Sequence, residues 1–60
     1  MFFKEHVKTL TDEALEEFIL EWRRTQFTWS QMRNARGVNR AEIALAVAFK
    51  ERDLRAKARG

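Results

Sequence analysis

Arginine and lysine are the side chains of this 60-residue sequence whose spacing most suggests a chemical role. Five of them fall near its end: Lys50, Arg52, Arg55, Lys57 and Arg59. On a helix, Arg52, Arg55 and Arg59 share one face because they are three and four residues apart. Guanidinium groups bind phosphate or carboxylate in a forked geometry. The spacing therefore predicts a basic helical surface, and its alternative role is to complement the dipole at a helix end.

Charge is divided unevenly along the chain. Residues 1–22 hold two basic and six acidic residues, a net charge of −4, whereas residues 23–60 hold ten basic and three acidic residues, a net charge of +7. A second basic cluster precedes the terminal one and consists of Arg23, Arg24, Arg33 and Arg36. The basic part favours a polyanionic partner, with nucleic acid first and an acidic protein second. In the alternative, the two halves neutralise each other within one folded unit.

Catalysis has little support in this sequence. His6 is the single histidine and there is no cysteine, which excludes a histidine-based triad, thiolate metal sites and disulfides within one chain. Four glutamates, Glu13, Glu16, Glu17 and Glu21, fit an exposed helix face better than an acid–base cluster. No glycine-rich phosphate loop is present. We therefore expect a binding protein that is not an enzyme and needs no cofactor or metal.

The length fits a single domain over residues 1–60, since two units would each be too small to bury a core. With no disulfide to stabilise so short a chain, self-association is the expected means of stabilisation. The longest apolar run, 43–49, is far too short to cross a membrane. We expect a cytoplasmic protein.

Three segments carry helix-start signals. Thr11 is a candidate N-cap, while Thr28 with Gln31 and Asn39 with Glu42 match the capping-box pattern. These signals predict an all-α, three-helix domain with helices over 12–25, 29–36 and 40–58. Gly37, the only internal glycine, is predicted to end the second helix in a left-handed conformation. Residues 2–10 fit either a short helix or an extended strap.

A short helix, a glycine turn and a longer helix suggest a helix-turn-helix arrangement. With the turn at 37–38, the helix from Arg40 presents mainly small apolar side chains to DNA: Ala41, Ala44, Leu45 and Ala48. These side chains touch a thymine methyl group but cannot make the hydrogen bonds that read base edges. This placement of the turn therefore predicts a poor DNA reader.

The sequence NRAEIALAVAFKERDLRAKA, residues 39–58, resembles the C-terminal helix-turn-helix of Fis-type DNA-binding proteins. The resemblance implies a supporting helix near 40–47, a turn near 48–49 and a recognition helix near 51–59. It also implies that Arg52, Arg55 and Lys57 face DNA, with Asn39 and Arg40 near phosphates and Leu54 as a buried anchor. Residues 48–52 are all helix formers, so local propensity favours the alternative of one unbroken helix.

The apolar run also suggests an interface. If Ile43, Ala46 and Val47 pack on the first predicted helix, then Leu45, Ala48 and Phe49 point elsewhere. These three are candidates for a homodimer or partner surface. Phe49 fits equally a place in the chain's own core, beside Phe2 or Phe3.

Together these patterns predict a small DNA-binding regulator of transcription, probing double-stranded DNA with a basic C-terminal helix. The candidate DNA-contacting residues are Arg36, Asn39, Arg40, Lys50, Arg52, Arg55, Lys57 and Arg59. The alternative is a helical protein-interaction module, since the size and the Phe-Thr-Trp-Ser stretch at 27–30 look like small early proteins of bacteriophages that inhibit host factors.

Overall fold

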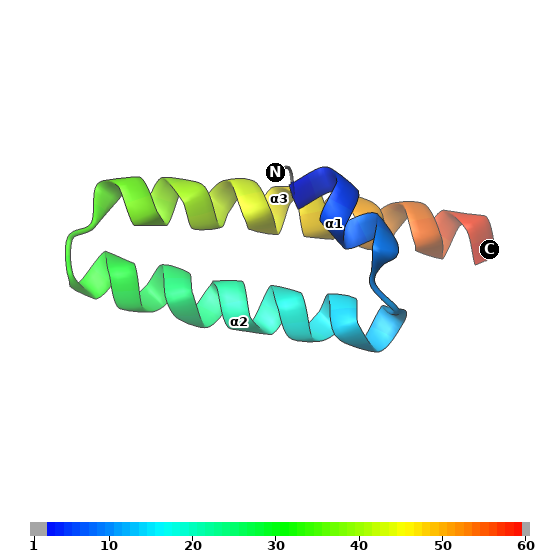
Figure 1. Ribbon diagram of the computed structural model, residues 1–60, viewed down its shortest axis with the longest axis horizontal. Helices are drawn as coiled ribbons and strands as arrows, with labels where there is room; N and C mark the ends of the chain where they lie inside the picture. Colours follow the sequence, from blue (N-terminus) through cyan, green and yellow to red (C-terminus); the bar gives the residue numbers. More distant parts are fainter. Residues whose placement is uncertain (1–2, 60) are drawn as a thin grey trace.

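A computed structural model of the protein describes residues 3–59, and these residues form three helices joined by short connections (Figure 1). Helix α1 spans Phe3–Thr9, α2 spans Asp12–Gln31 and α3 spans Ala35–Arg59. The predicted all-α, three-helix class is confirmed for this part of the chain. Of the two options for the first segment, residues 3–9 take the helix, and Phe2 lies outside the described residues. None of the described helices is long and apolar enough to span a membrane.

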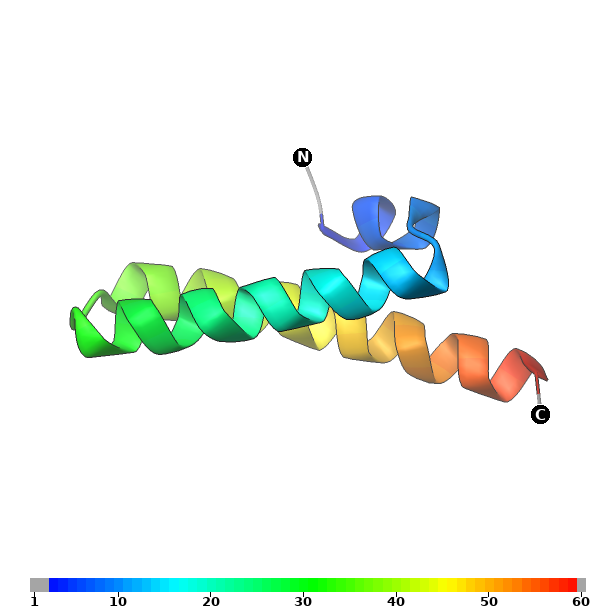
Figure 2. The ribbon, with the colours of Figure 1, turned by 90° about the horizontal axis from the view of Figure 1, so that it is seen from below.

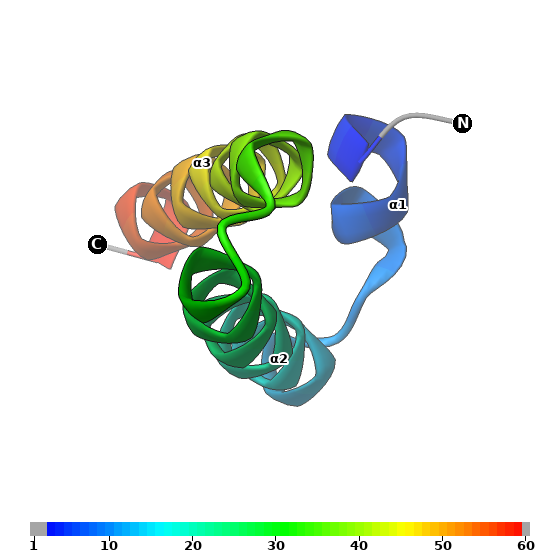
Figure 3. The same ribbon diagram turned by 90° about the vertical axis from the view of Figure 1, so that its left-hand side faces the viewer.

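Helices α2 and α3 form an antiparallel hairpin, and α1 lies against one side of it (Figures 1 and 2). The end view in Figure 3 shows the three helices at the corners of a triangle, with α1 beside α3. The molecule is elongated, with extents of 40 × 20 × 15 Å. The far end of α3 runs past the start of α2 (Figure 1).

The core lies where all three helices meet. It contains Val7 from α1, Leu15 and Ile19 from α2, and Leu45 and Ala48 from α3. Ala41, Ala44 and Ala48 are fully buried, so α3 turns an alanine surface toward its neighbours. Small side chains let helix axes approach closely. The larger aromatic groups lie around this centre, half-buried. Phe3, Phe18 and Trp22 contact one another, and Trp22 makes an edge contact with Trp29.

The structure confirms the first of the three predicted helix starts, with Thr11 as the N-cap of α2. Thr11 has extended backbone angles, and its hydroxyl oxygen accepts a hydrogen bond from the Ala14 backbone N–H at 3.1 Å. Leu10 and Leu15, on either side of the cap, both pack in the core region. Asp12 and Glu13 follow in the first turn, where the helix dipole favours negative charge.

The other two predicted helix starts are wrong. Helix α2 continues through Thr28 to Gln31, so the first helix does not end at Thr25, and Asn39 lies inside α3. Packing outweighs the capping signal at Thr28. Because α2 continues past this residue, Trp29 contacts Trp22 on the same helix, with ring centroids 6.1 Å apart. No proline or glycine interrupts α2 before its observed end.

The turn between α2 and α3 is a Schellman motif built without glycine. The Asn34 N–H donates to the Trp29 carbonyl oxygen at 2.8 Å and the Arg33 N–H donates to that of Ser30 at 3.1 Å. Arg33 occupies the left-handed position, with a φ of 57°. Asn34 then caps α3, since its Oδ1 accepts from the Gly37 N–H at 3.0 Å.

Gly37 is needed for close packing. The prediction of a left-handed glycine there is wrong, since no glycine among the described residues has a positive φ. Gly37 lies in the first turn of α3, is buried, and faces the Trp29 side chain. A Cβ atom at this position would come within 2.6 Å of Trp29 Cδ2 and 2.7 Å of Asn34 Nδ2. Glycine is therefore required because the indole occupies the space of a side chain.

Helix α3 is continuous for 25 residues, which corrects both helix-turn-helix placements. The turn expected at 37–38 lies within its first turn, and the turn implied near 48–49 falls in its middle. The alternative that local propensity favoured, an unbroken helix, is confirmed. The described chain bends at residues 32–34, between two antiparallel helices rather than the roughly perpendicular pair of a helix-turn-helix.

Candidate functional site

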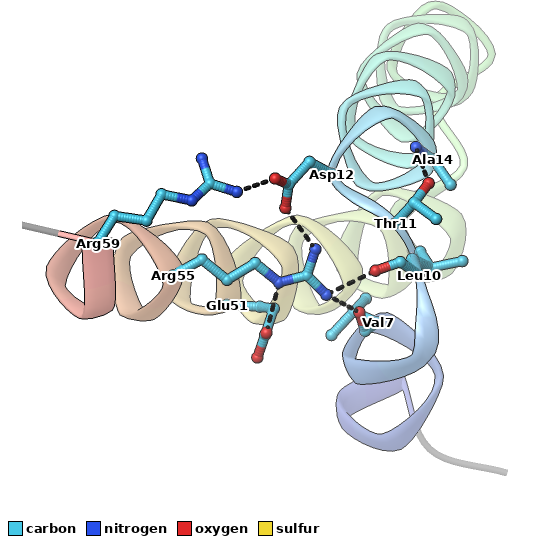
Figure 4. A network of polar contacts seen from close by, with 8 residues as sticks. All are labelled: Val7, Leu10, Thr11, Asp12, Ala14, Glu51, Arg55 and Arg59. Carbon is cyan, nitrogen blue, oxygen red and sulfur yellow. Dashed lines mark hydrogen bonds and ion pairs between the residues drawn. The ribbon is translucent and has the colours of Figure 1, made fainter.

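Arg55 joins all three helices at the centre of a polar network (Figure 4). Its Nη2 donates to the carbonyl oxygens of Leu10 at 2.7 Å and Val7 at 3.1 Å. Its Nη1 contacts Asp12 Oδ1 at 3.0 Å and its Nε contacts Glu51 Oε2 at 2.8 Å. The side chain is 19% exposed. In this conformation Arg55 stabilises the packing of α3 on the α1–α2 connection, and its donors are directed away from solvent.

Arg52 and Arg59 also lie beside the start of α2. Arg52 is 3.4 Å from Glu16, and Arg59 pairs with the second oxygen of Asp12 (Figure 4). The three arginines that were predicted to form a stripe thus do share a side of α3, and that side meets the acidic first turns of α2. These contacts are the internal neutralisation that the divided charge allowed as an alternative. Arg52 and Arg59 nevertheless remain 49% and 66% exposed, whereas Arg55 is largely buried.

The Arg55 contacts also complete the end of α1. A helix of seven residues leaves most of its last carbonyl groups without a partner in the helix. Arg55 donates to the Val7 carbonyl, which also accepts from the Leu10 N–H, and to the Leu10 carbonyl just past the helix end; its positive charge complements the negative end of the helix dipole. Helix α1 therefore depends on a side chain that is 45 or more residues away in the sequence.

The remaining candidates lie on the outward face of α3. Arg36, Arg40, Lys50 and Lys57 are exposed, and Asn39 is exposed beside them. Together with Ile43, Val47 and Leu54, the four cations follow one another at alternating spacings of four and three residues, which puts them on one stripe. We call this set the outward stripe: Arg36, Arg40, Ile43, Val47, Lys50, Leu54 and Lys57. It extends over about 32 Å of helix.

Carboxylates are missing from the outward stripe. Its four cations form no ion pair with any residue in the part of the chain that the structure describes. Arg40 lies over the Phe3 ring, with Cζ 5.8 Å from the centroid, and so borders α1. In contrast to Arg52, Arg55 and Arg59, these groups keep their charge available to a partner.

Helix α1 adds two lysines to this surface that the sequence interpretation did not select. Lys4 and Lys8 line a shallow groove between α1 and α3, together with Lys50. Val7, Val47, Leu54 and Glu51 complete the lining of the groove. The high density of basic residues near the end of the sequence favoured the last ten residues. The signal that identifies the exposed face is the alternating spacing of four and three residues from Arg36 to Lys57.

The residues proposed for a dimer surface are mostly internal. Leu45 is 6% exposed and Ala48 is fully buried, so the expectation that they point away from the chain's own core is wrong. Phe49 is half-buried against the core, and the Arg52 guanidinium lies 5.0 Å above its ring centroid. The large apolar side chains that are exposed lie elsewhere: Leu20, Phe27, Met32, Ile43 and Leu54.

Groups suited to other chemistry are dispersed. His6 is exposed, and its ring lies 5.7 Å from that of Phe18. Residues 3–59 contain no cluster of three or more His, Cys, Asp or Glu side chains arranged to hold a metal ion.

Comparisons of the chain with family models, with curated proteins and with solved structures found no match.

Proposed function

We propose that this protein is a small, non-enzymatic, cytoplasmic regulator that binds double-stranded DNA through the outward stripe and through Lys4 and Lys8 of α1. The observation that carries the proposal is the contrast between the two basic sides of α3. One side is neutralised by α2, and the other holds four cations without an ion pair among the described residues. Protein–DNA affinity depends mainly on such exposed cations, which replace counterions at phosphates.

The length of the stripe supports a duplex as the partner. Its cations are grouped at its two ends, Arg36 with Arg40 and Lys50 with Lys57. The stripe is about 32 Å long, close to one turn of B-form DNA at roughly 34 Å. Between the two groups, the exposed Ile43 offers apolar contact, which suits thymine methyl groups. Shape and charge therefore favour phosphate contacts with little base reading.

A matched pair of variants tests this assignment. Arg36→Gln with Arg40→Gln removes two cations from the outward stripe, and Arg52→Gln with Arg59→Gln removes two from the side that faces α2. The first variant should lose about tenfold in affinity for random-sequence duplex DNA and about two units of salt slope, since each phosphate contact adds about one. The second variant should bind as the unchanged protein does. The reverse result, or no binding at low salt, would refute the proposal.

A second candidate function has its own observation. Ile43 and Leu54 are each 51% exposed on the outward stripe, which is more apolar surface than phosphate contact requires. The groove of Lys4, Lys8 and Lys50 with an apolar floor fits an acidic amphipathic helix of a protein partner. The protein would then be an interaction module, such as an inhibitor of bacteriophage type. Binding that resists salt but is weakened by Leu54→Ser would favour this function over DNA binding.

We keep a homodimer as part of the proposal. Because Leu45 and Ala48 are buried, the dimer must use another surface, and the outer face of α2 offers one.

A further inference from the structure

The outer face of α2 carries a second alternating stripe, which faces away from α3. Glu13, Glu17, Leu20, Arg24 and Phe27 are separated by four, three, four and three residues, and all five are exposed. This is the spacing of a two-helix seam. Leu20 is 52% exposed and Phe27 is 67% exposed, so apolar surface on the seam is left open to solvent. Arg23, Arg24, Leu20, Phe27 and Thr28 line a shallow depression there.

Charge on this face changes sign at its middle. On the seam, Glu13 and Glu17 precede Leu20 and Arg24 follows it, with Glu16 and Arg23 beside them on one flank and Glu21 on the other. Residues 16–17 and 23–24 are equally spaced about Leu20. A second helix of the same sequence, laid antiparallel with a two-fold axis at Leu20, therefore brings Glu16 and Glu17 of each copy near Arg23 and Arg24 of the other, and places Glu13 opposite Phe27. A parallel arrangement would oppose like charges instead.

We infer that the occupant of this face is a second copy of the chain, in an antiparallel α2–α2 dimer centred on Leu20. The inference takes only the homodimer from the proposed function and does not depend on DNA binding. An isologous interface needs a surface that complements itself, and the sign change about Leu20 supplies this. A partner of a single charge sign would be attracted by one half of the seam and repelled by the other.

The chain exposes more surface than a compact monomer of its mass. The chain exposes 4905 Å². A compact monomer of its mass exposes roughly 4100 Å². The difference follows from the elongated shape of the hairpin. The elongated hairpin therefore has surface to contribute to a dimer, and the α2 seam is the part where apolar groups and complementary charges coincide.

Charge exchange across the two-fold axis gives a sharp test. Glu17→Arg makes the seam basic and Arg24→Glu makes it acidic, so each variant alone should self-associate at least about tenfold more weakly than the unchanged protein. An equimolar mixture of the two should associate again, because each mixed pair joins a basic seam to an acidic one. The double variant Glu17→Arg with Arg24→Glu should also regain self-association, since its charges are inverted but still complementary.

Two controls make the same charge changes elsewhere. Asp53→Arg and Arg36→Glu alter exposed residues of α3 that lie outside the seam, and they should leave self-association unchanged. Sedimentation velocity without DNA measures the association, and circular dichroism verifies that each variant stays helical. A monomeric unchanged protein at millimolar concentration, singles that associate like it, or a mixture that does not recover would each overturn the inference. Because DNA is absent, failure of DNA binding would not affect this result.

Discussion

The Nη2 atom of Arg55 lies 2.7 Å from the carbonyl oxygen of Leu10, which is 45 residues earlier in the sequence. This hydrogen bond connects the third helix to the junction of the first two. It involves a charged donor with a largely buried side chain, and such bonds are among the stronger ones in proteins. Arg55 is therefore expected to contribute more to the free energy of unfolding than any of the more exposed arginines.

Replacing Arg55 by Met should lower the free energy of unfolding by about 2–4 kcal/mol, because several charge-assisted hydrogen bonds are lost together. Arg55→Lys should recover only part of this, since an ammonium group cannot reach the carbonyls and carboxylates simultaneously. Arg52→Met is the matched control. Its ion pair with Glu16 is about half exposed and should change stability by less than about 1 kcal/mol. Thermal unfolding followed by circular dichroism measures all three, and equal losses for Arg55→Met and Arg52→Met would contradict the prediction.

Substitution of Gly37 by Ala should destabilise the protein, although alanine is the better helix former. The added methyl group meets the Trp29 ring at 2.6 Å, and overpacking of this kind costs roughly 1–3 kcal/mol. Helix propensity would alone stabilise the variant by about 1 kcal/mol. Combining Gly37→Ala with Trp29→Leu separates the two effects in a double-mutant cycle. A loss that persists without the indole would point to a cause other than this contact.

Arg33→Gly should stabilise the protein by about 1 kcal/mol, because a side chain in the left-handed region is strained by roughly that amount. Removal of a positive charge is a competing explanation. Arg33→Ala therefore serves as the control, since it removes the charge but keeps the Cβ atom. Urea unfolding should rank the glycine variant above the unchanged protein and the alanine variant close to it. Equal gains for both variants would assign the effect to charge.

Thr11→Ala should cost about 1 kcal/mol of stability by removing the acceptor for the Ala14 N–H. Thr11→Ser keeps the hydroxyl group and should retain most of it. Hydrogen exchange of the amides in the first turn of α2 gives a local measurement that does not depend on global unfolding. Faster exchange in the alanine variant alone is the expected result, and unchanged rates would exclude a capping role.

Local signals predicted an all-helical chain and the start of α2, but the predicted second helix, 29–36, spans the turn at residues 32–34. Thr11 was identifiable because a capping threonine and the backbone N–H that donates to it are only three residues apart. Asn34, the cap of α3, escaped the capping-box search because Gly37 stands where Glu or Gln is sought. A lone internal glycine has two common uses, a left-handed turn and a close approach, and only the position of Trp29 shows that the second applies.

The basic residues were harder to assign from sequence, since their partners are distant. Helical spacing correctly grouped Arg52, Arg55 and Arg59 on one side of α3. Which side faces solvent depends on the packing of α2, and the Arg55–Asp12 pair spans 43 residues. In the dense basic segment, Arg52, Arg55 and Arg59 thus form ion pairs, whereas Lys50 and Lys57 form none among the described residues.

The short turn at residues 32–34 has a consequence for the order of folding. Because it joins two long helices directly, the contacts nearest to it close small loops at little entropic cost. The hairpin should zip from this end toward the start of α2, on the microsecond-to-millisecond scale typical of chains dominated by local contacts. Helix α1 is too short to persist alone, and its anchor at Arg55 exists only after the hairpin has closed. Docking of α1 is therefore the last step of folding and the first to reverse.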